Sequence, residues 1–268
     1  MLATRIKTSL LLVICIVAMV WWAPVLLRAG FFVLLGLWAA LEWSRLVSLV
    51  LPKRVAFIAL VTAGVVAPIL AASMGFALLL WLQAAVLFWL WMVWLIVVTP
   101  TDLSAGVKWL GGLGVLIPAG LSVYLLLADL PAPRGGLLLL LVWAMVAAAD
   151  VGAYFAGRAF GRHKLAPRVS PGKTWEGVIG GALFALAVAQ VGALLLALPL
   201  VATALLAAVV IAASVVGDLT ESLFKRHAGV KDSGHFLPGH GGILDRIDGL
   251  VAALPFYVVG LHLWSMWH

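Results

Sequence analysis

The stretch that decides the fold reads VAFIALVTAGVVAPILAASMGFALLLWLQAAVLFWLWMVWLIVV and covers residues 55–98. It contains no charged residue, and it lacks the polar–apolar alternation that is typical of outer-membrane strands. Because a transmembrane helix needs about 20 apolar residues, this stretch is too long for one span and fits two. We therefore expect an all-α, polytopic integral membrane protein.

The rest of the chain agrees with this class, since 65% of its 268 residues are hydrophobic and only 10% are charged. A soluble core of this size does not need so much apolar surface. Hydropathy predicts a bundle of about nine transmembrane helices, at residues 9–27, 30–51, 55–73, 76–98, 107–127, 136–155, 178–197, 200–217 and 249–267.

No linker, low-complexity tract or clear repeat divides the sequence, so we treat residues 1–268 as one membrane domain. Only three acids precede residue 150. We therefore expect residues 1–149 to be mainly scaffold and lipid-facing spans. Residues 150–250 are expected to form the catalytic region with its polar loops.

The positive charges are distributed unequally between the two ends of the predicted spans. With nine spans, 14 Lys and Arg residues lie on the side of the amino terminus, and only Arg28 and Arg134 lie on the other. The positive-inside rule then places the amino terminus and the polar loops 156–177 and 218–248 on the cytoplasmic side of the membrane. Because orientation explains most of the net charge of +7, nucleic acid is not an expected partner.

The loop 218–248 reads DLTESLFKRHAGVKDSGHFLPGHGGILDRID and holds five acids, four Lys or Arg and three His. Charged groups are costly near a bilayer and usually mark a working site there. If the preceding span continues as a helix, Asp218, Glu221, Ser222 and Lys225 share one stripe. Asp245 and Asp248 lie three residues apart and can share a face at the start of the last span.

Carboxylates gathered in this way repel one another unless a cation lies among them, and hard oxygen ligands suit Mg²⁺ together with substrate phosphates. Zinc is disfavoured, since the chain has a single cysteine and no H-x-x-x-H pair. An ordinary solvated loop is the alternative, although orientation in the membrane requires neither the acids nor the glycines. The expected metal ligands are Asp218, Asp245 and Asp248, directly or through water, with Asp150, Glu176, Glu221 and Asp232 in a second tier.

The segment 150–177 contains Ser170-Pro171-Gly172-Lys173-Thr174. It has some likeness to a Walker loop, but the spacing fails because Pro167 stands where the first glycine is needed, and no strand–loop–helix context is predicted. The physical interpretation is a turn that presents Ser170, Lys173 and Thr174 to an anion. A basic loop that contacts anionic lipid head groups is the alternative.

Two patterns resemble a known family. The run Ser222-x2-Lys225-Arg226-x4-Lys231-Asp232-x-Gly234-x3-Pro238-x-His240-Gly241-Gly242-x2-Asp245-Arg246-x-Asp248 is similar to the signature of phosphatidate cytidylyltransferases (CDP-diacylglycerol synthases). The segments Asp150–Tyr154 and Lys164–Gly177 resemble the second conserved stretch of that family, with Val151 where a small hydroxyl residue is common.

The resemblance implies that CTP and phosphatidic acid react, with Mg²⁺, to give CDP-diacylglycerol and pyrophosphate for phospholipid synthesis. Lys225, Arg226 and Lys231 would neutralise phosphate oxygens, and Lys173, with Ser170 and Thr174, would hold one of the two anions. His240 would be a proton donor or a phosphate contact, unless it is only a turn residue, and Asp232 could instead orient Lys231. The remaining expected substrate contacts are Ser222, Gly241, Gly242 and Arg246.

Two other functions remain open. A different CTP-dependent lipid enzyme, such as a polyprenol or phytol kinase or an archaeal-lipid cytidylyltransferase, would use the same substrate class. An ion-coupled transporter is disfavoured, because its charges would lie within spans of paired halves, and no paired repeat is visible. The sequence does not decide on a homodimer, on an additional monovalent ion or on the acyl chains that are preferred.

Overall fold

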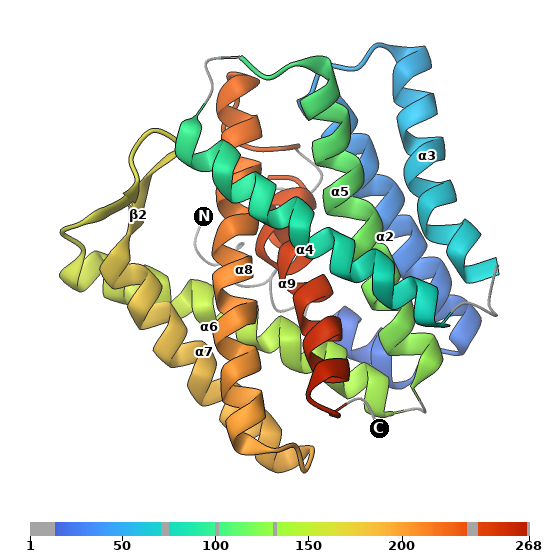
Figure 1. Cartoon of the computed structure of the whole chain (residues 1–268), viewed down its shortest axis with the longest axis vertical. Coiled ribbons are helices and arrows are strands. Elements are labelled where there is room, and N and C mark those ends of the chain that lie inside the picture. Colours follow the sequence, from blue (N-terminus) through green and yellow to red (C-terminus); the bar gives the residue numbers. More distant parts are fainter. Residues whose placement is uncertain (1–13, 71–74, 100–101, 131–132, 235–240, 267–268) are drawn as a thin grey trace.

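The computed structural model describes residues 14–70, 75–99, 102–130, 133–234 and 241–266. Within these ranges the chain is a bundle of long helices with one small β-hairpin at its side (Figure 1). The elements, in chain order, are α2 (Val25–Leu46), α3 (Leu51–Leu70), α4 (Gly75–Val98), α5 (Ala105–Tyr124), the π-helical turn η1 (Leu125–Asp129), α6 (Arg134–Phe160), β1 (Lys164–Ala166), β2 (Ser170–Thr174), α7 (Trp175–Leu195), α8 (Leu200–His227) and α9 (Leu244–Leu263).

The expected class, a polytopic helical membrane protein, is confirmed. Among the described residues, seven helices are long and apolar enough to cross a bilayer, and they correspond to α3 through α9. The stretch 55–98 is divided between α3 and α4, as its length predicts. Large apolar side chains such as Leu195 and Val201 lie more than three-quarters exposed on the outside, where lipid would cover them.

The first two predicted spans need correction. The span predicted over 9–27 does not continue as one helix, because its described part ends as a helix at Trp21 and α2 begins after Pro24. Proline lacks the N–H that a continuing helix needs, so the chain turns here. The following helix, α2, carries Arg28, Glu42 and Arg45, and it begins at Val25 and ends at Leu46 rather than at the predicted residues 30 and 51. The count of nine spans and the cytoplasmic amino terminus stay predictions, since residues 1–13 lie outside the described part.

Two helices extend further into the polar segments than hydropathy predicts. The span expected at 136–155 continues to Phe160, and the span expected at 200–217 continues to His227. The end of α8 is set by Gly229, whose φ of +68° is a conformation that glycine adopts without strain. The N–H groups of Gly229 and Val230 donate to the carbonyls of Arg226 and Lys225 and close the last turn. The stripe from Asp218 to Lys225 is therefore helical.

The segment expected to be a loop at 156–177 contains the antiparallel pair β1–β2, which the sequence analysis did not predict. Strand β2 leads directly into α7. The hydroxyl of Thr174 accepts a hydrogen bond from the N–H of Gly177 at 3.2 Å and so caps this helix. The hairpin projects beside the helix bundle (Figure 1).

Close packing at glycines sets the helix positions around the polar end of the bundle. At Gly217 on α8, an added Cβ would overlap the carbonyl oxygen of Asp248 on α9, and at Gly249 it would lie 3.3 Å from Ser214. At Gly152 on α6 it would lie 2.8 Å from the carbonyl oxygen of Gly180 on α7. The pairs α8–α9 and α6–α7 therefore pack backbone to backbone, which brings their polar residues close together.

Candidate active site

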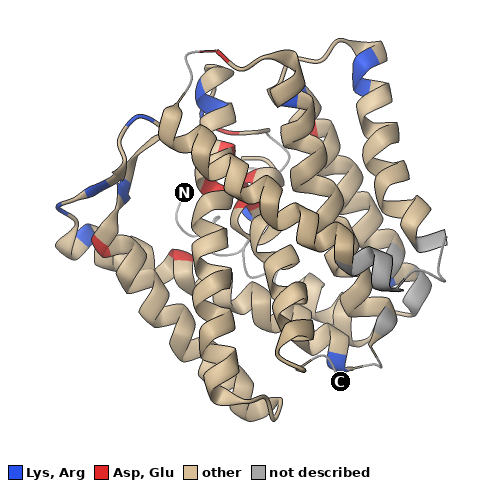
Figure 2. Cartoon of the chain, viewed as in Figure 1, with Lys and Arg blue, Asp and Glu red and all other residues tan. Residues whose placement is uncertain are grey.

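The two polar segments meet beside α8. The ammonium nitrogen of Lys173, on β2, lies 2.5 Å from a carboxylate oxygen of Asp218 on α8. The guanidinium Nε of Arg226, at the end of α8, donates to the carbonyl of Val169 at 3.3 Å. Figure 2 shows the hairpin's basic residues and the central acids at the same end of the bundle. The expectation that residues 156–177 and 218–248 lie together is borne out, while the side of the bilayer stays a prediction.

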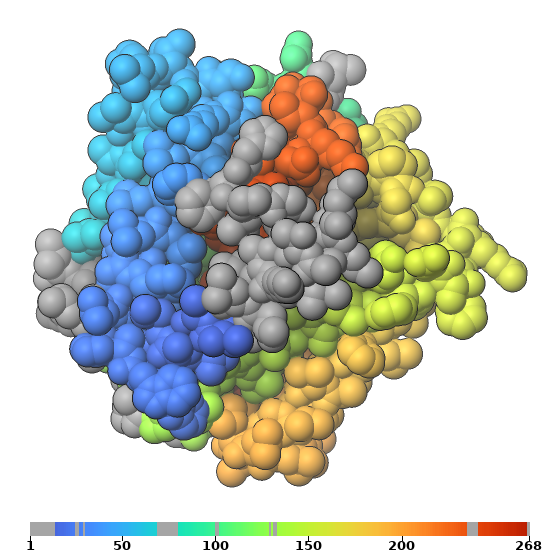
Figure 3. All heavy atoms as spheres, turned by 180° about the vertical axis from the view of Figure 1, so that it is seen from behind, coloured from blue at the N-terminus to red at the C-terminus, as the bar shows by residue number. Residues whose placement is uncertain are grey.

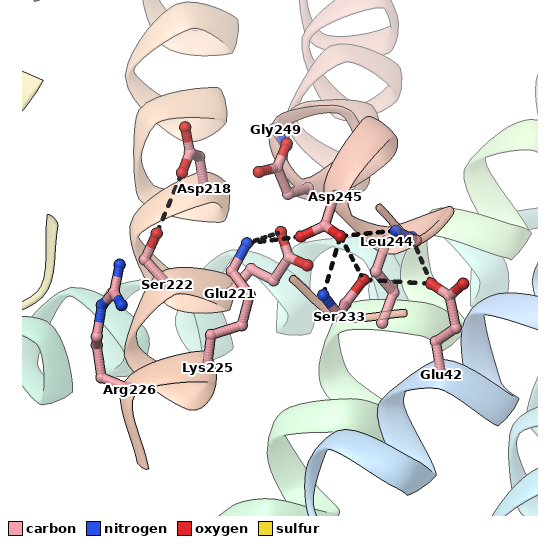
Figure 4. Close-up of polar contacts among 12 residues, drawn as sticks. Glu42, Asp218, Glu221, Ser222, Lys225, Arg226, Ser233, Leu244, Asp245 and Gly249 are labelled. Atoms are coloured by element: carbon pink, nitrogen blue, oxygen red, sulfur yellow. Dashed lines mark hydrogen bonds and ion pairs between the residues drawn. The ribbon is translucent and has the colours of Figure 1, made fainter. Parts of the chain in front are cut away.

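Within the predicted stripe on α8, Glu221 and Lys225 point toward Asp245 at the start of α9, while Ser222 lies on the other side of α8 (Figure 4). Ser222 donates its hydroxyl to Asp218 at 3.4 Å. One turn further, the ammonium group of Lys225 lies 3.4 Å from Glu221 and 2.7 Å from Asp245 on α9. The Lys225–Asp245 pair thus joins the two helices through largely buried charges, with side chains 11% and 7% exposed.

The carboxylate of Asp245 is surrounded by donors from this chain. While one oxygen binds Lys225, the other accepts from the N–H of Ser233 at 2.9 Å, from its hydroxyl at 3.0 Å and from the N–H of Gly242 at 2.8 Å. Gly241 has a φ of +83°, and a Cβ there would lie 2.6 Å from this same carboxylate. The glycines of the loop are therefore needed to let the backbone close around Asp245.

A second set of carboxylates comes from three helices. Asp150 on α6, Asp218 on α8 and Asp248 on α9 lie near enough for their charges to repel one another. Both carboxylate oxygens of Glu221 are buried and accept no hydrogen bond within the described ranges, although Lys225 lies nearby. No three His, Cys, Asp or Glu side chains in the described part of the chain form a ready-made metal site. The three helices supply carboxylate oxygens, and these side chains would have to move closer together to bind one cation.

The other expected site residues are distributed around this centre. Lys231 and Asp232 are exposed in the bend after α8, and Arg246 is exposed on α9, where its charge acts on Asp150. Ser170 is half-buried at the start of β2. His240 lies outside the described residues.

Glu176 and Thr174 already have structural partners. Glu176 accepts from the N–H groups of Arg162 and His163 and binds the His163 ring at 2.6 Å, which fastens the start of α7 to the end of α6. The cap made by Thr174 occupies its hydroxyl in a similar way. Neither contact belongs to the group formed by Asp150, Asp218 and Asp248.

A cavity of about 420 Å³ lies beside the Lys173–Asp218 pair. Asp150, Arg158 and Ser214 contribute polar groups to its wall. Small and apolar residues of α6, α7 and α8 form most of the rest, namely Ala149, Ala153, Gly157, Gly177, Val178, Gly181, Ile211 and Val215. Two cations and two carboxylates at the edge of an apolar groove suit a molecule that has a charged head and an apolar body.

Sequence reasoning missed one residue of this region, Glu42. It lies on α2, within the part expected to be scaffold, and it is only 2% exposed. Its carboxylate accepts from the N–H groups of Ile243 and Leu244, at 3.0 and 2.9 Å. The available signal was an acid inside an apolar helix, which is costly unless it has buried partners.

Comparison with known proteins identifies the family of this chain. The model of the cytidylyltransferase family matches residues 3–264, and the chain belongs to this family. A phosphatidate cytidylyltransferase of Pseudomonas aeruginosa is 42% identical, with 96% of each chain covered. Proteins of the same description from Haemophilus influenzae and Bacillus subtilis are 55% and 48% identical over 47% and 43% of this chain, and over 46% and 44% of their own lengths.

Proposed function

We propose that this chain transfers the cytidylyl group of CTP to phosphatidic acid and produces CDP-diacylglycerol and pyrophosphate. The family membership and a similar protein of that description, matched over nearly the whole chain, support this substrate pair. The structural observation that carries the proposal is the meeting of Lys173 with Asp218, which joins the polar segments 156–177 and 218–248 on α8. Two anionic substrates require such a mixture of cations and acids.

The reaction forms one bond and breaks one. A phosphate oxygen of phosphatidic acid attacks the α-phosphorus of CTP and forms a new P–O bond. The bond between the α-phosphorus and the bridging oxygen breaks, and its electron pair leaves with pyrophosphate. Because the attacking phosphate is already ionised at neutral pH, the protein needs no strong general base, and positioning and charge neutralisation carry most of the acceleration.

The cations of the site are placed to neutralise phosphate oxygens. Lys173 lies at the wall of the cavity and would bind one substrate phosphate while it keeps its contact with Asp218. Lys225 is held between Glu221 and Asp245, so its position is fixed before any substrate arrives. Arg226, Lys231 and Arg246 are more exposed and would contact the phosphates of CTP. We assign Ser170, Ser222 and the backbone of Gly241 to neutral contacts with these oxygens, while the N–H of Gly242 keeps its bond to Asp245.

The residues present fit a divalent cation of the Mg²⁺ type. Carboxylates from three helices repel one another, and the buried carboxylate of Glu221 has the ammonium group of Lys225 beside it at 3.4 Å. We propose that Asp218 and Asp248 bind the ion, with Asp150 and Glu221 in support. Asp245 would not bind the ion directly, because its oxygens are already bound by Lys225, Ser233 and Gly242. When bound, such an ion supplies positive charge to the CTP phosphates and to the departing pyrophosphate.

We propose that the site faces the cytoplasm from the inner membrane, where CTP is available and phosphatidic acid presents its head group. The unequal distribution of Lys and Arg supports this orientation. The apolar groove that adjoins Lys173 is consistent with a substrate whose acyl chains stay in the bilayer. The proposed reaction requires neither a particular oligomeric state nor a monovalent ion.

The decisive assay is label transfer with purified protein, phosphatidic acid and Mg²⁺. With CTP labelled at the α-phosphorus, we expect the label in the lipid product, and with CTP labelled at the γ-phosphorus, we expect it in pyrophosphate only. Transfer of the γ-label to lipid would instead identify a CTP-dependent lipid kinase. No transfer of either label would reject the proposed reaction.

A further inference from the structure

Glu42 holds the start of α9 from a distant part of the chain. Its two carboxylate oxygens accept from the first free N–H groups of α9, those of Ile243 and Leu244. The first N–H groups of a helix have no partner within the helix and carry its positive dipole end, so a carboxylate stabilises them. α9 therefore takes its cap from a helix about 200 residues earlier in the sequence, because no side chain of its own N-cap residue makes that bond.

The same carboxylate is linked to Asp245 through one hydroxyl. The hydroxyl of Ser233 lies 3.0 Å from Asp245 and 3.3 Å from Glu42, so its one proton is shared between the two carboxylates (Figure 4). Asp245 in turn binds Lys225 at 2.7 Å. A continuous set of polar contacts thus connects Glu42 on α2 with the cation that α8 contributes to the site.

The loop backbone is shaped around Glu42. A Cβ at Gly234 would lie 2.7 Å from one of its oxygens, and a Cβ at Gly242 would overlap the other. Both glycines therefore permit an approach to the carboxylate that no other residue allows.

In the space-filling view, the end of α8 and the residues after it, in orange, lie between the N-terminal helices, in blue, and the hairpin, in yellow (Figure 3).

Glu42 has a rigid support. The next residue, Trp43, is 1% exposed, packs against Phe224 of α8 with 4.6 Å between ring centroids, and donates to the carbonyl of Lys108 on α5 at 3.1 Å. Trp38, one turn before Glu42, donates to its carboxylate at 3.2 Å. In the described part of the chain Glu42 forms no ion pair with Lys, Arg or His, so hydrogen bonds and the helix end stabilise its buried charge.

We propose that Glu42 is a positioning residue for cytidylyl transfer: it fixes the 233–244 backbone so that Asp245 holds Lys225 in place. This inference depends on the proposed function for its catalytic readout. A carboxylate is required because three N–H donors converge on it from Trp38, Ile243 and Leu244, together with the hydroxyl of Ser233 that it shares with Asp245. An amide of the same size would turn an NH₂ group toward some of these donors and leave them unpaired.

The test compares Glu42→Gln, which keeps the size, with Glu42→Asp, which keeps the charge. For positioning by charge, we expect kcat to fall by about tenfold or more in Glu42→Gln and by less in Glu42→Asp. The KM for phosphatidic acid in mixed micelles should stay within about twofold of the wild-type value, because Glu42 does not line the cavity beside Lys173. A role in packing alone predicts the opposite order, with the isosteric Gln tolerated and the shorter Asp not.

Hydrogen exchange gives a readout that does not need turnover. We expect the amides of residues 241–250 to exchange faster in Glu42→Gln, while those of α6 stay unchanged. Ser44→Ala is the matched control, since Ser44 is fully buried on the same helix and donates only to the carbonyl of Leu41. If Glu42→Gln fails to insert, Ser233→Ala removes the link between Glu42 and Asp245, and it should lower kcat with the same unchanged KM.

Each result decides the matter. The positioning role is overturned if Glu42→Gln keeps the wild-type kcat and the wild-type hydrogen exchange, or if Ser44→Ala loses as much kcat as Glu42→Gln. Where Ser233→Ala has to be used, a wild-type kcat in that variant overturns it as well. If the wild-type protein transfers no cytidylyl group but Glu42→Gln still loosens residues 241–250, the proposed reaction fails and the positioning of the loop stands. If the wild type is active, but kcat is unchanged in Glu42→Gln and in Ser233→Ala and hydrogen exchange is unchanged as well, only the positioning role of Glu42 is rejected.

Discussion

Lys173 and Asp218 form an ion pair of 2.5 Å that joins the β-hairpin to the first residue of the polar stripe on α8. Their side chains are 24% and 28% exposed, so the pair lies at the boundary between the protein interior and the cavity. An ammonium group in this position neutralises the carboxylate in the free protein and is available to a phosphate when a substrate enters. Several expected properties of the site depend on this pair.

Replacing Lys173 with Gln should reduce kcat/KM by about 100-fold, because a preorganised positive charge beside the reacting phosphates is lost. The measurement is the rate of label transfer from CTP to lipid. Lys164→Gln is the control, since Lys164 is exposed on the neighbouring strand and does not line the cavity. Equal activity in the two variants would remove Lys173 from the site.

Asp245→Asn should abolish turnover while the protein still inserts into the membrane. The amide cannot accept from Lys225 and from the three donors of Ser233 and Gly242 at once, so Lys225 loses its fixed position. Initial rates and the amount of protein in the membrane fraction check this. Asp102→Asn, in the bend after α4, should behave as wild type, and normal activity of Asp245→Asn would contradict the account.

Gly241→Ala should lower both the stability of the loop and the rate. Alanine at a φ of +83° is strained, at a cost of about 1–3 kcal/mol, and its Cβ would lie 2.6 Å from Asp245. Thermal unfolding in detergent and initial rates measure the two effects. Gly36→Ala on α2, where an added Cβ meets nothing within 4 Å, should change neither, and a similar loss there would show that the strain at Gly241 is not the cause.

The sequence predicted those parts of the site that depend on local periodicity. Asp218, Glu221, Ser222 and Lys225 share a stripe because α8 continues for ten residues beyond its apolar part, and the spacing of the four residues is helical. That the two polar segments lie at the same end of the bundle followed from the distribution of Lys and Arg over the whole chain. Neither conclusion required knowledge of how distant segments pack.

The rest depends on contacts between distant segments. Glu42 was counted as one of few early acids, but its partners, Ile243 and Leu244, are set by the packing of α2 against α8, which hydropathy does not report. The hairpin was missed because β1 has only three residues and β2 contains proline and glycine, which disfavour strands. Likewise, Glu176 was a second-tier ligand by residue type, and only the fold pairs it with His163.

The central claim is that carboxylates of α8 and α9 together hold a divalent ion between two anionic substrates. Its most direct test is Mn²⁺ binding to the purified protein, measured by electron paramagnetic resonance with CTP present, in the wild type, Asp218→Asn and Asp248→Asn. We predict saturable Mn²⁺ binding in the wild type and an affinity that is lower by at least about tenfold in each variant. Unchanged Mn²⁺ affinity in both variants would contradict the claim.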